Sequence, residues 1–150
     1  MNRSETTGSN GDWIEVSDTA RLPSIPLVSV QMLAYNHGSY IAEAIEGVVS
    51  QIVDFPIELI IGEDCSDDTT REIVFSYQKR FPHMIRVLYS NHNVGFMENY
   101  RRVLLASNGE FIAACEGDDF WVSKTKLAQQ IAILSKNQSV DISIHPKYAG

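Results

Sequence analysis

The run Phe111-Ile112-Ala113-Ala114-Cys115 leads directly into Glu116-Gly117-Asp118-Asp119-Phe120-Trp121. The first run is apolar and typical of a buried strand, and the second places three carboxylates at the end of that strand. Carboxylates this close together repel one another unless a positive charge is present, and hard divalent cations such as Mg²⁺ and Mn²⁺ prefer oxygen ligands. The alternative is a solvated acidic loop that caps the next helix, because acidic residues are usually exposed.

Strand-like and helix-like runs alternate on both sides of this loop. Apolar or alternating patterns predict strands at residues 27–33, 57–61, 85–89, 111–115 and 140–144. Apolar residues at helical spacing predict helices at about residues 39–52, 68–81, 96–104 and 123–134. Strands that alternate with amphipathic helices favour a mostly parallel sheet with helices on both faces. The expected fold is therefore α/β, with three layers (α/β/α) and a Rossmann-like sheet.

Polar residues follow four of the predicted strands. In an open parallel sheet, ligands bind at the carboxyl ends of the strands, which meet at one edge. The residues at these ends are Tyr35 and Asn36, Glu63 and Asp64, Asn93 and Gly95, and Asp118 and Asp119. Because four loops of unrelated sequence bring polar groups to one edge, a ligand site is favoured over a solvated acidic loop.

Composition and charge exclude several classes of function. The chain has 150 residues, a net charge of −7 and a pI near 5.0, so bulk electrostatics argue against nucleic acids as partners. Cys65 and Cys115 lack the spacing of a zinc site and are expected to be free thiols in a reducing compartment. Residues 1–25 are polar and are expected to form a flexible leader, which leaves 26–150 as the domain.

Several other side chains have simple structural interpretations. His37 and His92 lie in loops and are expected to be solvated, and Lys126 is expected to be solvated as well. Trp121 is expected to pack beneath the acidic loop. Asp67 or Asp68 is expected to cap the following helix, where negative charge is favoured.

These segments resemble the family 2 glycosyltransferases, whose nucleotide-diphospho-sugar transferase fold is called GT-A. Segment order and spacing agree from about Pro26 onward, and the hexamer EGDDFW is similar to the EGDDYW-type variant of the DxD motif of this family. The matching segments are Val28-Ser29-Val30 with Tyr35-Asn36, residues 58–69, Asn93-Val94-Gly95 and residues 116–121.

The resemblance implies a metal-dependent, inverting transfer of a sugar from a UDP- or GDP-linked donor to an acceptor hydroxyl. It implies that Asp64 hydrogen-bonds the donor base, that Asp118 contacts the ribose or the sugar, and that Asp119 ligates Mn²⁺ or Mg²⁺. The other residues expected on the donor side are Leu33, Ala34, Tyr35, Asn36, Glu63, Asn93 and Gly95. Arg101 or Arg102 could reach the phosphates, although neither corresponds to a motif of the family.

The same resemblance implies a general base in a later segment, beyond Gly150, together with the acceptor-binding half. We therefore expect a domain truncated at its C-terminus that holds the donor and metal half-site. Expected partners are a nucleotide-sugar and a glycan or lipid-linked acceptor, in cell-surface polysaccharide biosynthesis. The expected location is the cytoplasm, including the inner face of the membrane, and an open sheet edge would favour a homo-oligomer.

Two alternatives remain open at this point. One is a non-catalytic, nucleotide-binding fragment or interaction module on the same fold. The other is a different metal-dependent α/β enzyme, such as a phosphoryl-transfer protein, which the Asp118-Asp119 pair allows but no P-loop supports.

Overall fold

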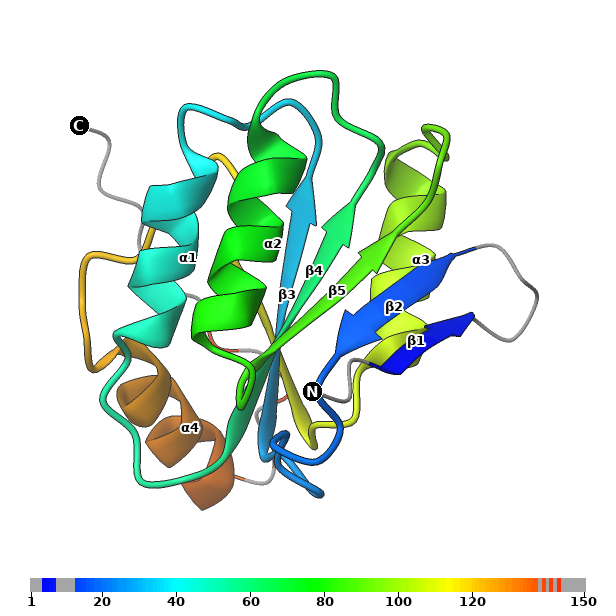
Figure 1. The fold of residues 1–150 in the computed structure, drawn as a ribbon. Helices are drawn as coiled ribbons and strands as arrows, with labels where there is room; N and C mark the ends of the chain where they lie inside the picture. The colour runs from blue at the N-terminus through cyan, green and yellow to red at the C-terminus, as the bar shows by residue number, and fades with distance from the viewer. Residues whose placement is uncertain (1–3, 8–12, 138, 140, 142, 144–150) are drawn as a thin grey trace.

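The computed structural model of the chain describes residues 4–7, 13–137, 139, 141 and 143. Within these residues one sheet contains six strands in the order β1-β2-β5-β4-β3-β6 (Figure 1). The strands are β1 (Ser4–Thr7), β2 (Ile14–Ser17), β3 (Val28–Ala34), β4 (Ile57–Glu63), β5 (Ile85–Tyr89) and β6 (Phe111–Ala114). The helices are α1 (Ile41–Val49), α2 (Thr70–Arg80), α3 (Phe96–Ala106) and α4 (Lys126–Lys136).

The four strands from β3 to β6 run parallel to one another. β3 pairs with β4 along its whole length, from Val28 opposite Ile57 to Ala34 opposite Glu63, and β6 pairs with the other side of β3. β5 pairs with β4. The predicted mostly parallel α/β sheet is therefore confirmed, and the strand predicted at 140–144 lies largely outside the described residues.

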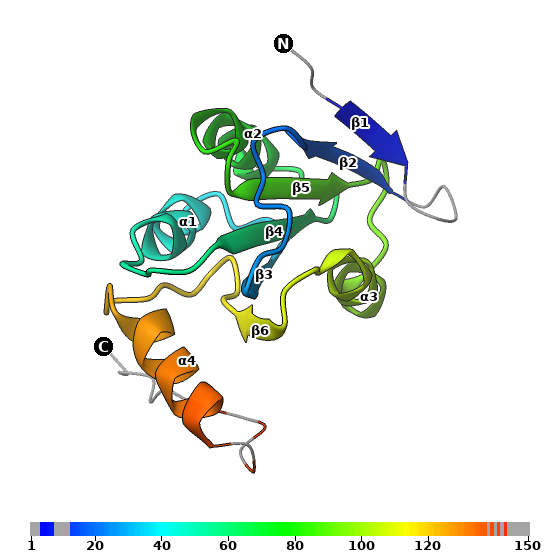
Figure 2. The ribbon, with the colours of Figure 1, turned by 90° about the horizontal axis from the view of Figure 1, so that it is seen from below.

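Helices cover both faces of this sheet. Figure 2 shows α1 and α2 on one face and α3 on the other, which gives the expected three layers. The larger core cluster lies on the face of α1 and α2 and includes Val30, Ile45 and Ile61, all fully buried. The smaller cluster lies on the face of α3 and consists of Trp13, Leu33, Ile60, Leu88 and Val103. Every residue of the two central strands, β3 and β4, is buried, as is typical of a parallel sheet that is covered on both faces.

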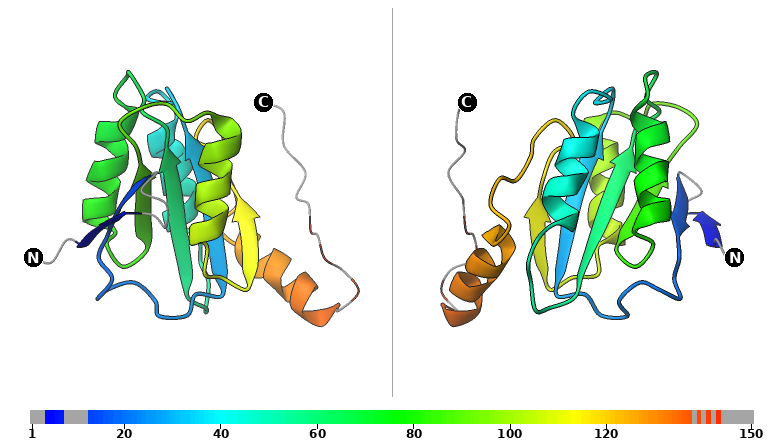
Figure 3. Two further views of the ribbon diagram at one scale, coloured as in Figure 1. Left: turned by 90° about the vertical axis from the view of Figure 1, so that its right-hand side faces the viewer. Right: turned by 60° about the vertical axis from the view of Figure 1, so that its left-hand side comes forward.

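The expected flexible leader is wrong for residues 13–17. β2 pairs antiparallel with β5, so that Ile14 lies opposite Tyr89, and Trp13 is only 7% exposed. Figure 3 shows β1 and β2 at one edge of the sheet and β6 at the other. The physical reason is that β5 would otherwise present unpaired backbone groups. A four-residue strand among polar neighbours carries too weak a pattern to show this from sequence.

A buried polar network joins β2, β5, β4 and β3 near the amino ends of the parallel strands. The guanidinium of Arg86 donates two hydrogen bonds to Glu15, at 2.8 and 3.0 Å, and one to Glu58 at 2.9 Å. Ser29 donates to the other carboxylate oxygen of Glu58 at 2.5 Å. Burial would lower the pKa of Arg86, but the hydrogen bonds from its guanidinium to Glu15 and Glu58 raise it on balance. The network fastens the sheet at the end opposite the polar loops.

Among the described residues no helix is long and apolar enough to cross a bilayer.

Candidate functional site

The loops that follow β3, β4 and β6 lie side by side, with the β3 loop in the middle. The backbone N–H of Asp64, just after β4, donates to the carbonyl of Ala34 at 3.0 Å. The N–H of Gly117, after β6, donates to the carbonyl of Leu33, also at 3.0 Å. The loops after β4 and β6 are therefore hydrogen-bonded to opposite sides of the end of β3. Asp64 and the Asp118-Asp119 pair both lie at the carboxyl end of the parallel strands.

Asp64 organises the loop that follows β5. Its side chain is buried, with the residue only 3% exposed, and its carboxylate accepts hydrogen bonds from the N–H groups of Val94 at 2.7 Å and Gly95 at 3.0 Å. The side-chain amide of Asn93 donates to the carbonyl of Asp64 at 3.1 Å. Gly95 has a φ of +84°, a backbone conformation that residues other than glycine rarely adopt. The structure thus brings together Asp64, Asn93 and Gly95 from two separate predicted motifs.

Glu63 lies in β4 rather than in the predicted loop, because β4 extends two residues further than the sequence pattern indicated. Its side chain is fully buried, and it accepts a hydrogen bond from Arg71 at 2.5 Å and another from the N–H of Ser66 at 2.7 Å. These contacts bind the loop after β4 to α2. Glu63 therefore stabilises the carboxyl end of β4 from inside the protein and offers no exposed carboxylate to a ligand.

Arg102, which was predicted to be a candidate phosphate ligand, is buried and supports the site from inside the protein. The residue is 1% exposed, and its guanidinium donates to the carbonyl of Glu63, to Ser90 Oγ and to Asn99 Oδ1 at 2.8, 3.0 and 2.8 Å. Burial lowers the pKa of Arg102, and the nearby Asp64 and Glu63 oppose that shift. Arg102 therefore points into the protein, away from any ligand in solvent. Arg101, one residue earlier, pairs with Glu98 at 2.6 Å.

One signal in the sequence could have identified this support. Asn99, Arg102 and Val103 lie at the i, i+3 and i+4 positions of α3, and all three are buried. A charged residue on the inward face of a helix needs partners, so its position alone predicts a buried polar network. Asn99 completes this network by donating from its side-chain amide to the carbonyl of Gly62 at 2.9 Å.

The loop after β3 is locked to the loop after β4. Asn36 accepts a hydrogen bond from the N–H of Asp67 at 2.9 Å, and its own N–H donates to Ser66 Oγ at 3.0 Å. Asn36 and Cys65 have left-handed φ values of 53° and 59°. Non-glycine residues in this region cost free energy and cluster at functional sites. Tyr35 is 44% exposed beside them, so its ring is available to a ligand.

Leu33 and Ala34 contribute backbone groups instead of side chains. Both residues are buried, at 6% and 1% exposure, and their carbonyls accept the N–H groups of Gly117 and Asp64. They therefore shape the edge of the sheet, while the exposed side chain nearest to them in sequence is Tyr35.

In the acidic loop the two aspartates differ in exposure. The side chain of Asp118 is 58% exposed, whereas Asp119 is half-buried and its N–H donates to the carbonyl of Glu116 at 3.0 Å. Trp121 packs against the larger core cluster, as predicted. Lys126 differs from its expected solvated state, since its ammonium lies 4.7 Å from the centre of the Trp121 ring. Burial lowers the pKa of Lys126.

The acidic loop fits a divalent cation that the ligand helps to hold. Within the described ranges no group of three or more His, Cys, Asp or Glu side chains is arranged to hold a metal ion. Mg²⁺ is nevertheless commonly bound by one or two carboxylates, with phosphate and water oxygens completing the shell. Asp118 and Asp119 offer oxygen donors of this kind, so these residues fit a metal that arrives with a diphosphate.

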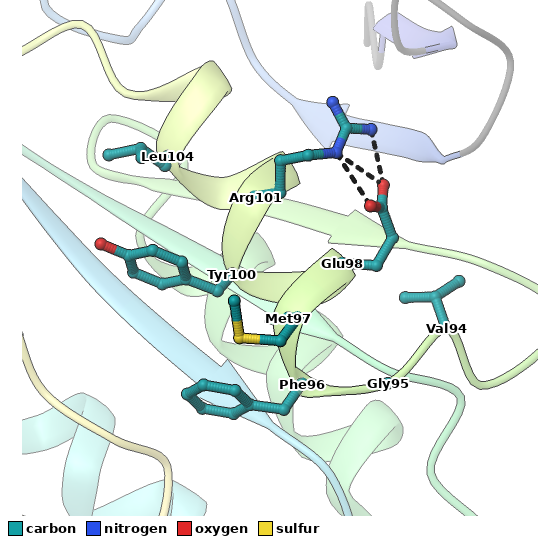
Figure 4. A pocket seen from close by; sticks show the side chains of 8 residues that line it. All are labelled: Val94, Gly95, Phe96, Met97, Glu98, Tyr100, Arg101 and Leu104. Atoms are coloured by element: carbon teal, nitrogen blue, oxygen red, sulfur yellow. Dashed lines mark hydrogen bonds and ion pairs between the residues drawn. The ribbon is translucent and has the colours of Figure 1, made fainter.

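A groove of about 670 Å³ lies along α3, next to the segment that Asp64 holds. Figure 4 shows its lining side chains, and Phe96 and Met97 are 63% and 72% exposed. Glu98 and Arg101, the charged residues in the lining, pair with each other. The groove is therefore mainly apolar, and neither aspartate of the acidic loop lines it.

Two solved structures share this α/β fold. The mannosyltransferase PcManGT from Pyrobaculum calidifontis, in complex with GDP-Man and Mn²⁺, superimposes with a TM-score of 0.66 at 22% identity, over 74% of this chain and 33% of that one. Residues 1–349 of S. aureus TarS with UDP-GlcNAc give 0.65 at 27% identity, over 80% and 37%.

The sequence model of glycosyl transferase family 2 matches residues 29–149, and the chain belongs to this family. An uncharacterised protein of Mycobacterium tuberculosis is 37% identical over 79% of this chain and 34% of its own length. The putative teichuronic acid biosynthesis glycosyltransferase TuaG of Bacillus subtilis is 36% identical over 73% of this chain and 42% of its own. The chain thus spans a third to two fifths of the length of these relatives.

Proposed function

We propose that this chain forms the donor- and metal-binding half-site of an inverting glycosyltransferase that uses a nucleoside-diphosphate sugar. The observation that carries the proposal is the arrangement of the parallel strands, which puts Asp64 and the Asp118-Asp119 pair on either side of the β3 end. Family membership supports glycosyl transfer. UDP-GlcNAc in the TarS structure supports a UDP-linked donor. The name of TuaG supports a role in polysaccharide synthesis.

Each acid has a distinct role in this proposal. The carboxylate of Asp64 has lone pairs beyond the two used by Val94 and Gly95, and one of them accepts a hydrogen bond from a ring N–H of uracil or guanine. The exposed ring of Tyr35 covers the base. Asp118, with its exposed carboxylate, accepts a hydroxyl of the ribose or sugar, and Asp119 ligates the cation.

A divalent ion held at Asp119, when bound, stabilises the negative charge that develops on the leaving diphosphate. The chain itself prepares this site, because the N–H of Gly117 fixes the acidic loop to β3 and the N–H of Asp119 closes its turn. A general base for the acceptor hydroxyl and the acceptor site are assigned to no residue of this chain.

Calorimetric titration with UDP, GDP and UDP-GlcNAc, each with and without Mn²⁺, tests the proposal. We expect binding that needs the metal and that Asp119→Ala abolishes. The matched control is Asp54→Ala, because Asp54 is exposed and precedes β4, at the opposite edge of the sheet. Absence of binding for every nucleotide at millimolar concentration would reject the half-site, and metal-dependent binding that survives Asp119→Ala would reject the role of Asp119. Turnover of a sugar donor by this chain would exclude a non-catalytic module.

A further inference from the structure

His37 has a side chain that the proposed roles leave unexplained. It lies in the loop after β3 and was expected to be solvated, but the side chain is only 24% exposed. Its ring nitrogen Nδ1 is buried and has no hydrogen-bond partner among the described residues. The other nitrogen, Nε2, lies 4.0 Å from Oδ2 of Asp118. The imidazole thus stands between the interior and the exposed carboxylate of the acidic loop.

The backbone of His37 is fixed from both sides. Its N–H donates to Thr70 Oγ1 at 2.8 Å, and its carbonyl accepts the N–H groups of Tyr40 and Ile41, both at 2.8 Å, at the start of α1. The residue therefore links α2 to α1, and these bonds fix the backbone position from which its ring extends.

The ring also packs directly on the acidic loop. A Cβ atom added to Gly117 would lie 2.6 Å from His37 Nδ1 and 2.9 Å from the carbonyl of Leu33. Gly117 is the residue before Asp118, so the backbone that carries the aspartate is in contact with the imidazole. A residue other than glycine would separate the two.

The buried Nδ1 determines which tautomer of the ring is favoured. In neutral histidine one nitrogen donates and the other accepts. A buried N–H without an acceptor is costly and rare, whereas an acceptor without a donor is better tolerated. The hydrogen therefore belongs on Nε2, where it faces Oδ2 of Asp118.

We propose that His37 is a positioning residue for Asp118: its neutral Nε2–H holds one oxygen of the carboxylate and leaves the other for the donor. A small rotation of the exposed Asp118 side chain closes the 4.0 Å separation to a hydrogen bond. Because the neutral ring adds no positive charge, it orients the aspartate without replacing the cation. This inference rests on the proposed function.

The first test is a double-mutant cycle read by titration with UDP and Mn²⁺. We expect His37→Ala to weaken binding by about 3- to 10-fold, as is common for coupled neighbours, and to have little effect when Asp118→Ala is already present. His37→Gln should recover part of the loss, because its amide offers an N–H near the position of Nε2. His92→Ala is the matched control, since His92 is exposed in a loop at the same edge.

Additive effects of His37→Ala and Asp118→Ala, or a His37→Gln variant as weak as His37→Ala, would overturn the inference. A second test needs no nucleotide: long-range ¹H–¹⁵N NMR of the wild-type protein should show the Nε2–H tautomer, and an Nδ1–H tautomer would contradict it. If the wild type binds no nucleotide, the proposed function fails and the NMR result still decides the tautomer. If it binds and the cycle is additive, only the role of His37 fails.

Discussion

The carboxylate of Asp64 accepts the backbone N–H of Val94 at 2.7 Å, and this bond ties the end of β4 to the loop after β5. A second bond reaches the same carboxylate from Gly95. The family resemblance assigns Asp64 to base recognition, and the same residue holds the loop after β5 in place. The two roles predict different effects of mutation.

Asp64→Asn should destabilise the protein as well as weaken nucleotide binding. The amide keeps one acceptor oxygen but points its NH₂ at a backbone N–H, so one buried hydrogen bond is lost and we expect a cost of about 1–3 kcal/mol. Urea denaturation measures this cost, and hydrogen exchange at the amides of Val94 and Gly95 should become faster. Asp67→Asn is the control, because the side chain of Asp67 is exposed. Unchanged exchange at Val94 and Gly95 would contradict the structural role.

Arg102→Met should be among the most destabilising substitutions in the chain. It leaves the carbonyl of Glu63, Ser90 Oγ and Asn99 Oδ1 without their donor, and each unsatisfied buried group costs about 1–3 kcal/mol. We expect a loss of at least about 3 kcal/mol in the free energy of unfolding, measured by chemical denaturation. Arg101→Met, on the next residue of the same helix, should cost much less because that side chain is partly exposed. Equal losses for the two variants would show that Arg102 is not a buried support.

Gly117→Ala should disturb the acidic loop. The new methyl group would lie 2.6 Å from His37 Nδ1 and 2.9 Å from the carbonyl of Leu33, and relieving such overlaps typically costs about 1–3 kcal/mol. Thermal unfolding and Mn²⁺-dependent titration with UDP should both show a loss. Phe120→Ala, in the same loop but with a side chain that is half exposed, should change the unfolding temperature less. A Gly117→Ala variant with wild-type stability would mean that the loop shifts freely.

Asp68 should stabilise the fold in a pH-dependent way. Burial raises the pKa of Asp68, but hydrogen bonds from Thr70 and Gly38 outweigh this and hold the pKa below its ordinary value of 3.8. A carboxyl whose pKa is lowered by folding stabilises the protein above its ordinary pKa, and the effect is lost as the pH falls through the folded value. The free energy of unfolding of the wild type should therefore exceed that of Asp68→Ala by about 1 kcal/mol at pH 7. This difference in stability should shrink below about pH 4.

The check on Asp68 is a series of urea denaturation curves between pH 7 and pH 3. Asp68→Asn serves as the control, because it retains an oxygen acceptor but cannot bind the proton. It should lose less stability than Asp68→Ala at pH 7. A difference between wild type and Asp68→Ala that grows as the pH falls would have the wrong sign for this mechanism.

The parallel sheet was predictable because its strands are short apolar runs separated by amphipathic helices, so that the pattern of burial is local. The edge that carries Asp64 and the Asp118-Asp119 pair followed from the direction of those strands. Glu63 was misplaced because it stands between Gly62 and Asp64, a combination typical of a loop, and only pairing with Ala34 and burial beside Arg71 show that β4 continues.

The supports of the site were harder to predict because they join residues far apart in the chain. Helical spacing predicts that Arg102 faces inward, but it does not show that the guanidinium reaches a carbonyl 39 residues earlier. The contact of the His37 ring with Gly117 and its proximity to Asp118 depend on the order of the strands, in which β3 lies next to β6. Long-range pairings of this kind are fixed by packing, not by local preference.

Trp13→Ala should show that the N-terminal strands belong to the folded domain. The indole is 7% exposed and packs with Leu33, Ile60, Leu88 and Val103 in the smaller core cluster, and truncation of a buried Trp costs about 3–5 kcal/mol. Chemical denaturation should detect a loss of this size, and hydrogen exchange along β5 should become faster as its pairing with β2 weakens. Ile25→Ala, at a residue that is 80% exposed, should change stability by less than about 0.5 kcal/mol. Two variants of equal stability would mean that Trp13 is not part of the core and that residues 13–17 add nothing to the sheet.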